Sequence, residues 1–323
     1  MFFCLLTALA FLIAASWWAY RTAFYSPKSR RVGVDAPLEG VQYQEFSEHI
    51  HRISGIMQKI PCEDVTIQSH DGLSLHGRYY HMHDGAPLEI LFHGYRSHPF
   101  RDCSGGHALS RKMGFNALVI DQRAHGESGG NTITFGIKER MDALCWISYA
   151  NGRFGTEQPI ILSGLSMGAA TVLMTANLDL PDNVVCLIAD SPYSAPAAII
   201  EKVGRESHYP MAICRPFLYL GAWIFGKFRL NATAAKEAVS HARVPILLIH
   251  GEADNFVPCS MSLEIAQCCT SPVTVHTFPN AGHGLCYMVD PRRYERIVYE
   301  FFQSIPALCN RIRPEFIAQL YEK

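Results

Sequence analysis

Six short apolar segments, separated from one another by stretches of helical character, constrain the fold more than any other feature of this sequence. The segments cover residues 88–92, 117–120, 160–162, 184–189, 246–249 and 273–278. Strands that are apolar on both faces and alternate with helices are typical of a mainly parallel sheet covered by helices on each side. The sequence therefore predicts an α/β fold. In such sheets, ligand sites form at the carboxyl ends of the strands.

The composition excludes several classes of protein. Charged residues make up only 18% of the 323 residues and the formal net charge is −1, so no nucleic-acid partner is expected. The 11 cysteines are scattered without C-x-x-C pairs, which is typical of a reducing compartment. The close-set pairs His49/His51 and His81/His83 lack acidic or cysteine companions at ligand spacing. We therefore expect neither a metal nor a cofactor.

The amino-terminal segment from Phe2 to Tyr20 contains no charged residue. As a helix it would be about 28 Å long, close to the thickness of a bilayer's hydrocarbon core. Basic residues follow the segment, beginning with Arg21, whereas a cleaved signal peptide carries its positive charge before the apolar run. The pattern favours an uncleaved membrane anchor over residues 1–21, with the rest of the chain on the cytoplasmic side. A cleaved signal and a buried core helix are the alternatives.

The rest of the chain divides into a connecting part and one large domain. Residues 22–61 are interpreted as a linker and an amphipathic lead-in helix, and residues 62–323 as the main domain. The domain is expected to begin with a hairpin that turns at Asp71-Gly72. A helical insertion at about residues 194–243 is expected to form a lid.

The segment Gly164-Leu165-Ser166-Met167-Gly168 carries the strongest chemical signal. It follows an apolar strand and precedes a helical run rich in alanine. This G-x-S-x-G pattern is typical of a sharp strand-to-helix turn that exposes a serine hydroxyl above the sheet. Strand and helix pass so close in this turn that a Cβ at either glycine is expected to clash. Ser166 is therefore the predicted nucleophile.

A serine that attacks an acyl group needs two N–H donors for the oxyanion that develops on the substrate. In this kind of turn, one donor is the residue after the nucleophile, and the other comes from the loop after the third strand. These positions correspond to the backbone amides of Met167 and Tyr95.

An acid and a base follow two later strands. Asp254 comes after the strand at 246–249, and His283 comes after the strand at 273–278. The order Ser166, Asp254, His283 matches a hydrolase triad in which the histidine is the general base and the aspartate orients it. Asp190 is a rival for the acid and His125 a rival for the base, although their expected roles are a buried capping carboxylate and a residue that holds a loop.

Five motifs in this order resemble those of serine hydrolases of the α/β-hydrolase superfamily, over about residues 62–306. They are residues 93–95, 121–130, 164–168, 251–258 and 282–284. With the apolar amino-terminus, the chain is similar to bacterial membrane-anchored members of the esterase and lipase type. The resemblance implies an α/β-hydrolase fold with a helical lid after the sixth strand. Ala124 stands where relatives commonly carry glycine, which matters only if that backbone needs a positive φ.

These patterns predict a serine hydrolase of the carboxylesterase or lipase type. It would cleave a carboxylic ester, a thioester or a small amide of an apolar, lipid-like acyl substrate through an acyl-enzyme. An acyltransferase with the same triad and a binding protein without turnover are the alternatives. The lid contains an apolar stretch at residues 210–228, with Trp223 among the residues expected to line an acyl pocket. The same stretch could instead contact the membrane or be ordinary core packing.

Overall fold

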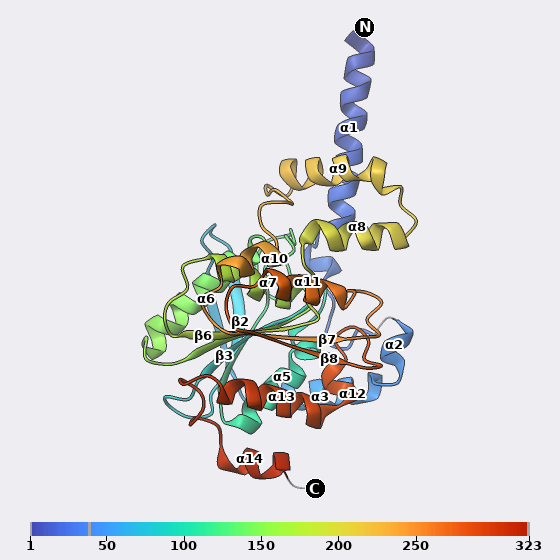
Figure 1. Ribbon diagram of the computed structural model, residues 1–323. Helices are drawn as coiled ribbons and strands as arrows, with labels where there is room; N and C mark the ends of the chain where they lie inside the picture. Colours follow the sequence, from blue (N-terminus) through green and yellow to red (C-terminus); the bar gives the residue numbers. More distant parts are fainter. Residues whose placement is uncertain (1, 38–39, 322–323) are drawn as a thin grey trace.

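The computed structural model describes residues 2–37 and 40–321, which form a sheet flanked by helices on both faces (Figure 1). The eight strands are arranged in the order β1-β2-β4-β3-β5-β6-β7-β8. Their bounds are β1 Glu63–Gln68, β2 Ser74–Tyr80, β3 Leu88–Phe92, β4 Asn116–Ile120, β5 Ile160–Leu165, β6 Val184–Asp190, β7 Ile246–Gly251 and β8 Val273–Phe278. β2 pairs antiparallel with β1 and with β4, and the pairs from β4 through β8 are parallel. The predicted α/β fold class is confirmed.

Helices cover the sheet in two layers. The helices of the described chain are α1 Phe2–Ala23, α2 Val41–Gln44, α3 Ser47–Gln58, α4 Pro99–Asp102, α5 Ser104–Met113, α6 Glu139–Phe154, α7 Met167–Met174, α8 Pro196–Glu206, α9 Met211–Ile224, α10 Ala235–Ala238, α11 Ser260–Cys268, α12 Cys286–Val289, α13 Pro291–Gln303 and α14 Pro314–Tyr321. Figure 1 shows α6, α7, α10 and α11 over one face and α3, α5 and α13 over the other. Both faces of the inner strands are therefore buried, which is why their sequences are apolar without alternation.

Several strands extend further toward the site than their apolar sequence predicts. β5 continues from Leu162 to Leu165, because Gly164 still pairs with Phe92 of β3. β7 likewise continues through His250 to Gly251. Apart from Leu165, these added residues are polar or small, so hydrophobicity alone does not identify them as strand. They bring the ends of β5 and β7 to the edge where the predicted chemical groups lie.

The segment after α1 packs against the loop at residues 121–130. Tyr25 forms a β-bridge with Thr132, and the Ser26 amide donates to the carbonyl oxygen of Asn131. Arg31 clasps the same loop, because its guanidinium donates to the carbonyl oxygens of His125, Gly126, Ser128 and Gly130. Residues assigned to a linker from the sequence thus form part of the packed structure. A single arginine in a polar stretch has no periodicity that would have predicted this.

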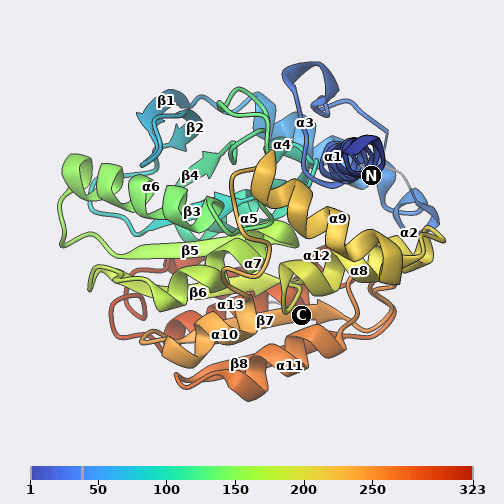
Figure 2. The same ribbon diagram turned by 90° about the horizontal axis from the view of Figure 1, so that it is seen from above.

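Helices α8 and α9, which belong to the predicted lid, lie beyond the layer of α7, α10 and α11, and α9 packs on α1. α8 and α9 cross above the sheet, and α1 runs past α9 and away from the domain (Figure 1). α1 is long and apolar enough to cross a membrane. Its first turns are exposed, whereas Ser16, Ala19 and Tyr20 near its end are buried. In the view from above, α1 stands beside α9 rather than over the middle of the sheet (Figure 2).

The expectation that Trp223 lines an acyl pocket is wrong. The side chain is 60% exposed, and it points away from the cavity that Leu218 and Met211 of the same helix help to line. The reason is that α9 is apolar nearly all round, so the sequence carries no signal for which of its faces turns inward.

Candidate active site

Ser166 occupies a strained turn between β5 and α7. Its backbone angles are φ 57° and ψ −115°, a combination rarely adopted by a residue with a side chain. A Cβ on Gly164 would lie 2.4 Å from the carbonyl carbon of Gly168, and a Cβ on Gly168 would lie 2.1 Å from the carbonyl oxygen of Phe92. The predicted reason for both glycines is confirmed. The turn holds the serine hydroxyl above the end of the sheet.

Three predicted residues, each from a different loop, come together here. Ser166 Oγ lies 2.8 Å from His283 Nε2, and His283 Nδ1 lies 2.7 Å from Asp254 Oδ2. All three side chains are buried. A carboxylate can only accept, so Nδ1 of His283 carries the proton, and Nε2 is left to accept from the serine hydroxyl. This is the arrangement in which a histidine can remove the serine proton.

Asp254 is held as a carboxylate by several donors. Its Oδ1 accepts from the amides of Phe256 and Val257 at 2.9 and 2.8 Å. Burial by itself would raise the pKa of Asp254, but hydrogen bonds from His250 and His283 hold that pKa below its usual range. The negative charge next to the imidazole therefore persists through the neutral pH range.

His250 is a residue of the site that sequence reasoning missed. It is buried at the end of β7, with Nε2 lying 2.8 Å from the Val257 carbonyl oxygen and 3.3 Å from Asp254 Oδ2. Its Nδ1 lies 2.6 Å from Ser262 Oγ. The ring thus ties the loop that carries Asp254 to α11. Its position directly after an apolar strand and before the motif at 251–258 was the only signal in the sequence.

The rival acid, Asp190, has different partners. It ends β6 and is buried, and its Oδ1 accepts from Ser191 Oγ at 2.8 Å. Burial raises the pKa of Asp190. Within the described chain, His283 forms no hydrogen bond to it. The geometry that orients the imidazole therefore involves Asp254.

Two backbone amides close to the serine were predicted as donors to an oxyanion. A Cβ on Gly94 would lie 3.4 Å from Ser166 Cβ, which places the loop after β3 directly beside the nucleophile. The amides that flank Tyr95 in this loop are engaged, Gly94 N with Asp102 Oδ2 at 2.8 Å and Arg96 N with His125 Nε2 at 3.0 Å. Among the described residues, the amides of Tyr95 and Met167 have no hydrogen-bond partner. They are available to an oxygen of a bound ligand.

The expected role of His125, to hold a loop, is confirmed. The ring is buried and its Nδ1 donates to the Arg123 carbonyl at 2.9 Å, so Nε2 accepts from Arg96 in the loop after β3. Burial lowers the pKa of His125 and keeps the ring neutral, as this acceptor role requires. His125 thus connects the loop at 121–130 to the loop that carries Tyr95.

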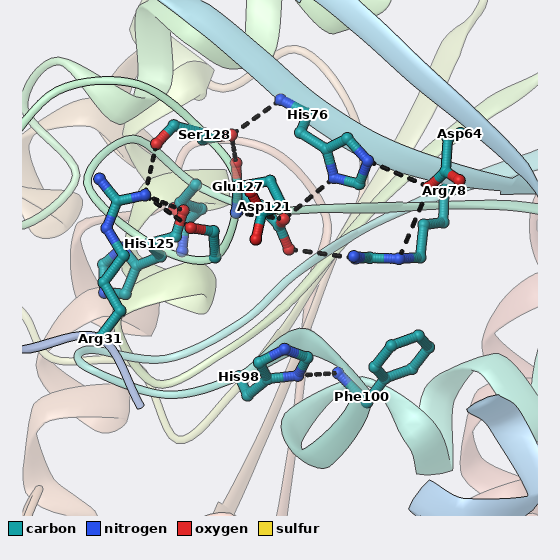
Figure 3. A network of polar contacts seen from close by, with 12 residues as sticks. Arg31, Asp64, His76, Arg78, His98, Phe100, Asp121, His125, Glu127 and Ser128 are labelled. Atoms are coloured by element: carbon teal, nitrogen blue, oxygen red, sulfur yellow. Dashed lines mark hydrogen bonds and ion pairs between the residues drawn. The ribbon is translucent and has the colours of Figure 1, made fainter. Parts of the chain in front are cut away.

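A polar network supports the loop at 121–130 from the other side (Figure 3). Asp121 accepts from His76 at 3.0 Å, from Arg78 at 3.3 Å and from the Glu127 amide at 2.9 Å. The Ser128 hydroxyl donates to the Asp121 carbonyl at 2.5 Å. These bonds fasten the loop to β2, so the support for the amide of Tyr95 extends back into the sheet.

The same loop contains Ala124, which stands at the position where a glycine was expected. Its φ is +62°, so this backbone does adopt the conformation that favours glycine. The side chain is fully buried, and the cost of the left-handed conformation is roughly 1–2 kcal/mol. The surrounding hydrogen bonds and the clasp of Arg31 hold the loop in place despite this cost.

Ser166 lies where two cavities meet. A cavity of about 330 Å³ is enclosed by α1, α8 and α9, and its lining is predominantly apolar. A second cavity of about 680 Å³ lies on the other side of the serine and includes Gln42, Arg101, Asp102 and His283. Four residues line both cavities: Tyr95, Arg96, Ser166 and Phe256. The nucleophile therefore separates an apolar compartment from a more polar one.

Two other features of the surface lie away from the serine. A larger cavity of about 840 Å³ lies at the opposite edge of the sheet and shares no lining residue with either cavity at Ser166.

His70, Asp71 and Asp142 are close enough together to suggest a metal site. The Arg123 guanidinium lies between the two carboxylates, however, and donates to Asp71 at 3.0 Å and to Asp142 at 2.6 Å. It supplies the positive charge that a cation would supply.

Comparison with known proteins supports the assignment of the fold. Residues 88–231 match the Hydrolase_4 family model, described as serine aminopeptidase, S33. The esterase Pf2001 of Pyrococcus furiosus has a similar structure, with a TM-score of 0.64 and 21% identity over 87% of this chain and 98% of that one. The chain has the α/β-hydrolase fold. Its sheet order and the position of its serine agree with that fold.

Other similar proteins show comparable sequence identity. The uncharacterized protein YqkD of Bacillus subtilis is 25% identical over 256 residues, which cover 79% of this chain and 84% of that protein. Human protein ABHD12B is 25% identical over 189 residues, which cover 55% of this chain and 48% of that one. Est1E of Butyrivibrio proteoclasticus, solved with ferulic acid bound, has a TM-score of 0.56 and 21% identity over 74% of this chain and 98% of that one. As is typical of the α/β-hydrolase fold, this chain carries its serine on the turn after β5.

Proposed function

We propose that this α/β-hydrolase is a serine esterase, acting on a carboxylic ester, a thioester or a small amide through an acyl-enzyme on Ser166. The observation that carries the proposal is the unbroken series of hydrogen bonds from Ser166 through His283 to Asp254. In the described part of the chain, the amides of Tyr95 and Met167 have no hydrogen-bond partner, so they are free to serve as the two donors that acyl transfer requires. A structural serine would need neither feature.

The proposed reaction follows from these positions. Ser166 Oγ attacks the carbonyl carbon while its proton passes to His283 Nε2, and the charge on Asp254 stabilises the imidazolium that forms. The carbonyl oxygen becomes an oxyanion and accepts hydrogen bonds from the amides of Met167 and Tyr95. His283 then returns the proton to the leaving alcohol. In the second half, water attacks the acyl-enzyme and gives a proton to His283 Nε2, which returns it to Ser166 Oγ as the acyl–oxygen bond breaks and the acid leaves.

The two cavities suggest how the substrate lies. The apolar cavity between α1, α8 and α9 suits the acyl chain, because each buried methylene contributes about 0.8 kcal/mol. The more polar cavity of about 680 Å³ suits the alcohol part of an ester, or the leaving group of an amide or thioester. An apolar acyl ester matches both compartments at once.

We also propose that α1 stays attached and anchors the protein, with the domain on the cytoplasmic side. Cleavage near the end of α1 would remove buried parts of the fold, since Ser16, Ala19 and Tyr20 are buried. The Tyr20 hydroxyl lies 2.7 Å from Thr132 Oγ1. The basic residues that follow α1 favour the cytoplasmic orientation. On this proposal, residues 1–21 are the anchor, 22–61 a connecting segment that packs on the domain, and 62–323 the hydrolase domain.

The test is labelling of the full-length protein in membranes with a fluorophosphonate, together with hydrolysis of a water-soluble acetyl ester. The wild type should be labelled, and Ser166→Ala should lose both the label and several orders of magnitude of turnover. Ser304→Ala, at the residue that follows α13, is the matched control. Wild-type turnover in Ser166→Ala would overturn the proposal, and a wild type with neither label nor turnover would indicate a binding protein. The intact mass of the membrane-derived protein tests retention of α1.

A further inference from the structure

The outward face of α9 is apolar, which is unusual for a helix in contact with water. Ala212, Ile213, Pro216, Trp223 and Ile224 are exposed on it, and Ile213 and Trp223 are 65% and 60% exposed. A helix facing water carries polar residues on that side. The one charged residue of α9, Arg215, is paired with Glu201 of α8 at 2.6 Å. This face therefore needs an apolar neighbour outside the domain.

The position of α9 along α1 indicates what that neighbour is. The ring of Phe217 meets Phe11 at 6.1 Å, and the ring of Phe225 meets Trp17 at 5.0 Å. α9 therefore lies beside α1 from Phe11 onward, and the part of α1 before Phe11, residues 2–10, projects beyond it (Figure 1). Nine helical residues extend only about 13 Å, less than half of a hydrocarbon core of about 30 Å. If α1 enters the membrane to its full depth, α9 enters with it.

The apolar cavity lies between these same helices. Its walls include Trp18, Ala19 and Thr22 of α1, Val203 of α8, and Met211 and Leu218 of α9. The cavity of about 680 Å³ is lined on its far side by residues 36–37 and 40–43 and by the segments at 101–106 and 285–288, away from α9. The acyl compartment thus lies on the membrane side of Ser166, and the more polar compartment lies on the side away from it.

We propose that α9 lies in the near leaflet of the membrane beside α1, and that the substrate is an acyl ester of that leaflet. The acyl chain of this substrate enters the apolar cavity between α1, α8 and α9, and its polar part occupies the cavity of about 680 Å³ on the other side of Ser166. The substrate half of this inference rests on the proposed function of Ser166, whereas the depth of α9 does not.

The depth of α9 is measured with the protein's own tryptophans. The full-length variant Trp17→Phe/Trp18→Phe keeps Trp223 as the probe and Trp146, which is fully buried, as an internal reference. In vesicles of phosphatidylcholine brominated on the acyl chains, quenching of Trp223 is expected, and iodide in the water should have little effect. The same variant with Trp223→Phe added keeps Trp146 as its only tryptophan and gives the background quenching. Quenching by iodide and not by bromine would overturn the inference.

The substrate half is tested by charging the outward face. Ile213→Glu lies outside both cavities and should leave turnover of a water-soluble acetyl ester unchanged, while turnover of a long-chain ester presented in vesicles falls at least tenfold. Leu263→Glu, at an exposed apolar position of α11, is the matched control and should affect neither. Equal vesicle turnover in Ile213→Glu and the wild type would overturn the inference. A wild type inactive on both esters would instead contradict the function proposed for Ser166.

Discussion

Gly221 of α9 lies directly against the main chain of Ser16 in α1. A Cβ on Gly221 would lie 2.4 Å from the Ser16 carbonyl oxygen and 3.1 Å from the Cβ of Tyr20. Small residues allow two helices to approach this closely, above all in a membrane. The contact makes α1 part of the wall of the domain's apolar cavity. A fragment that began after Arg31 would lose that wall and the clasp on the loop at 121–130.

Gly221→Ala should therefore destabilise the protein by about 1–3 kcal/mol, the usual cost of overpacking. Thermal unfolding of the full-length protein in detergent measures the effect. Gly152→Ala on α6 is the control, because a Cβ there meets no atom within 4 Å. If both variants melted at the same temperature, the close approach of α1 and α9 would be contradicted.

Asp254→Asn should lower kcat by roughly 10⁴, the loss seen when the acid of a serine protease triad is replaced in the same way. The amide cannot stabilise the imidazolium or fix the required tautomer of His283. Asp190→Asn should lower kcat less than tenfold, because Asp190 bonds Ser191 and not the imidazole. Saturation kinetics on a soluble ester compare the two variants. A larger loss in Asp190→Asn would show that the acid has been assigned to the wrong residue.

The sheet and the nucleophile could be predicted from sequence because local rules govern them. Strands buried on both faces must be apolar, and the turn at Ser166 tolerates no side chain at Gly164 or Gly168. The packing of α9 on α1 could not be predicted in the same way. A helix that is apolar on every side has no periodic signal for its neighbour.

Two other features depend on tertiary context alone. The positive φ of Ala124 is invisible in a sequence without glycine at that position, because the cost is offset by hydrogen bonds from distant segments. His250 holds Asp254 through space, and no spacing rule connects the two. Residues of this kind support the site indirectly. Sequence patterns report the residues that local geometry requires, and they miss those that only the packed fold brings together.

Glu89→Gln should change how stability depends on pH. Burial raises the pKa of Glu89 to about 7 although Ser110 and Ser163 donate to it. Below about pH 4.5, the carboxyl is protonated in the folded and unfolded states alike, and as pH rises toward 7 only the unfolded state ionises freely. The free energy of unfolding of the wild type therefore falls by up to about 3 kcal/mol over this range. That of the variant with a neutral glutamine does not.

Denaturant unfolding of both proteins at pH 5 and pH 8 measures this difference. The comparison between variant and wild type cancels the other titrating groups, including Asp190 and Asp254. The glutamine variant should be close to the wild type at pH 5 and more stable at pH 8. The same difference at both pH values would show that the carboxyl ionises in the folded state as it does in water.

The lining of the apolar cavity should set the acyl length that the enzyme prefers. In wild type, kcat/KM on soluble esters in detergent should climb by roughly fourfold per methylene, the equivalent of about 0.8 kcal/mol, until the cavity is full. Val203→Phe narrows the cavity and should end the climb at a shorter chain, whereas Leu218→Ala should extend it. Trp223→Ala is the matched control on the same helix as Leu218, because Trp223 points outward and should leave the profile unchanged. A wild-type profile that peaks at acetyl, or identical profiles in all four proteins, would mean that the acyl chain does not enter the cavity between α1, α8 and α9.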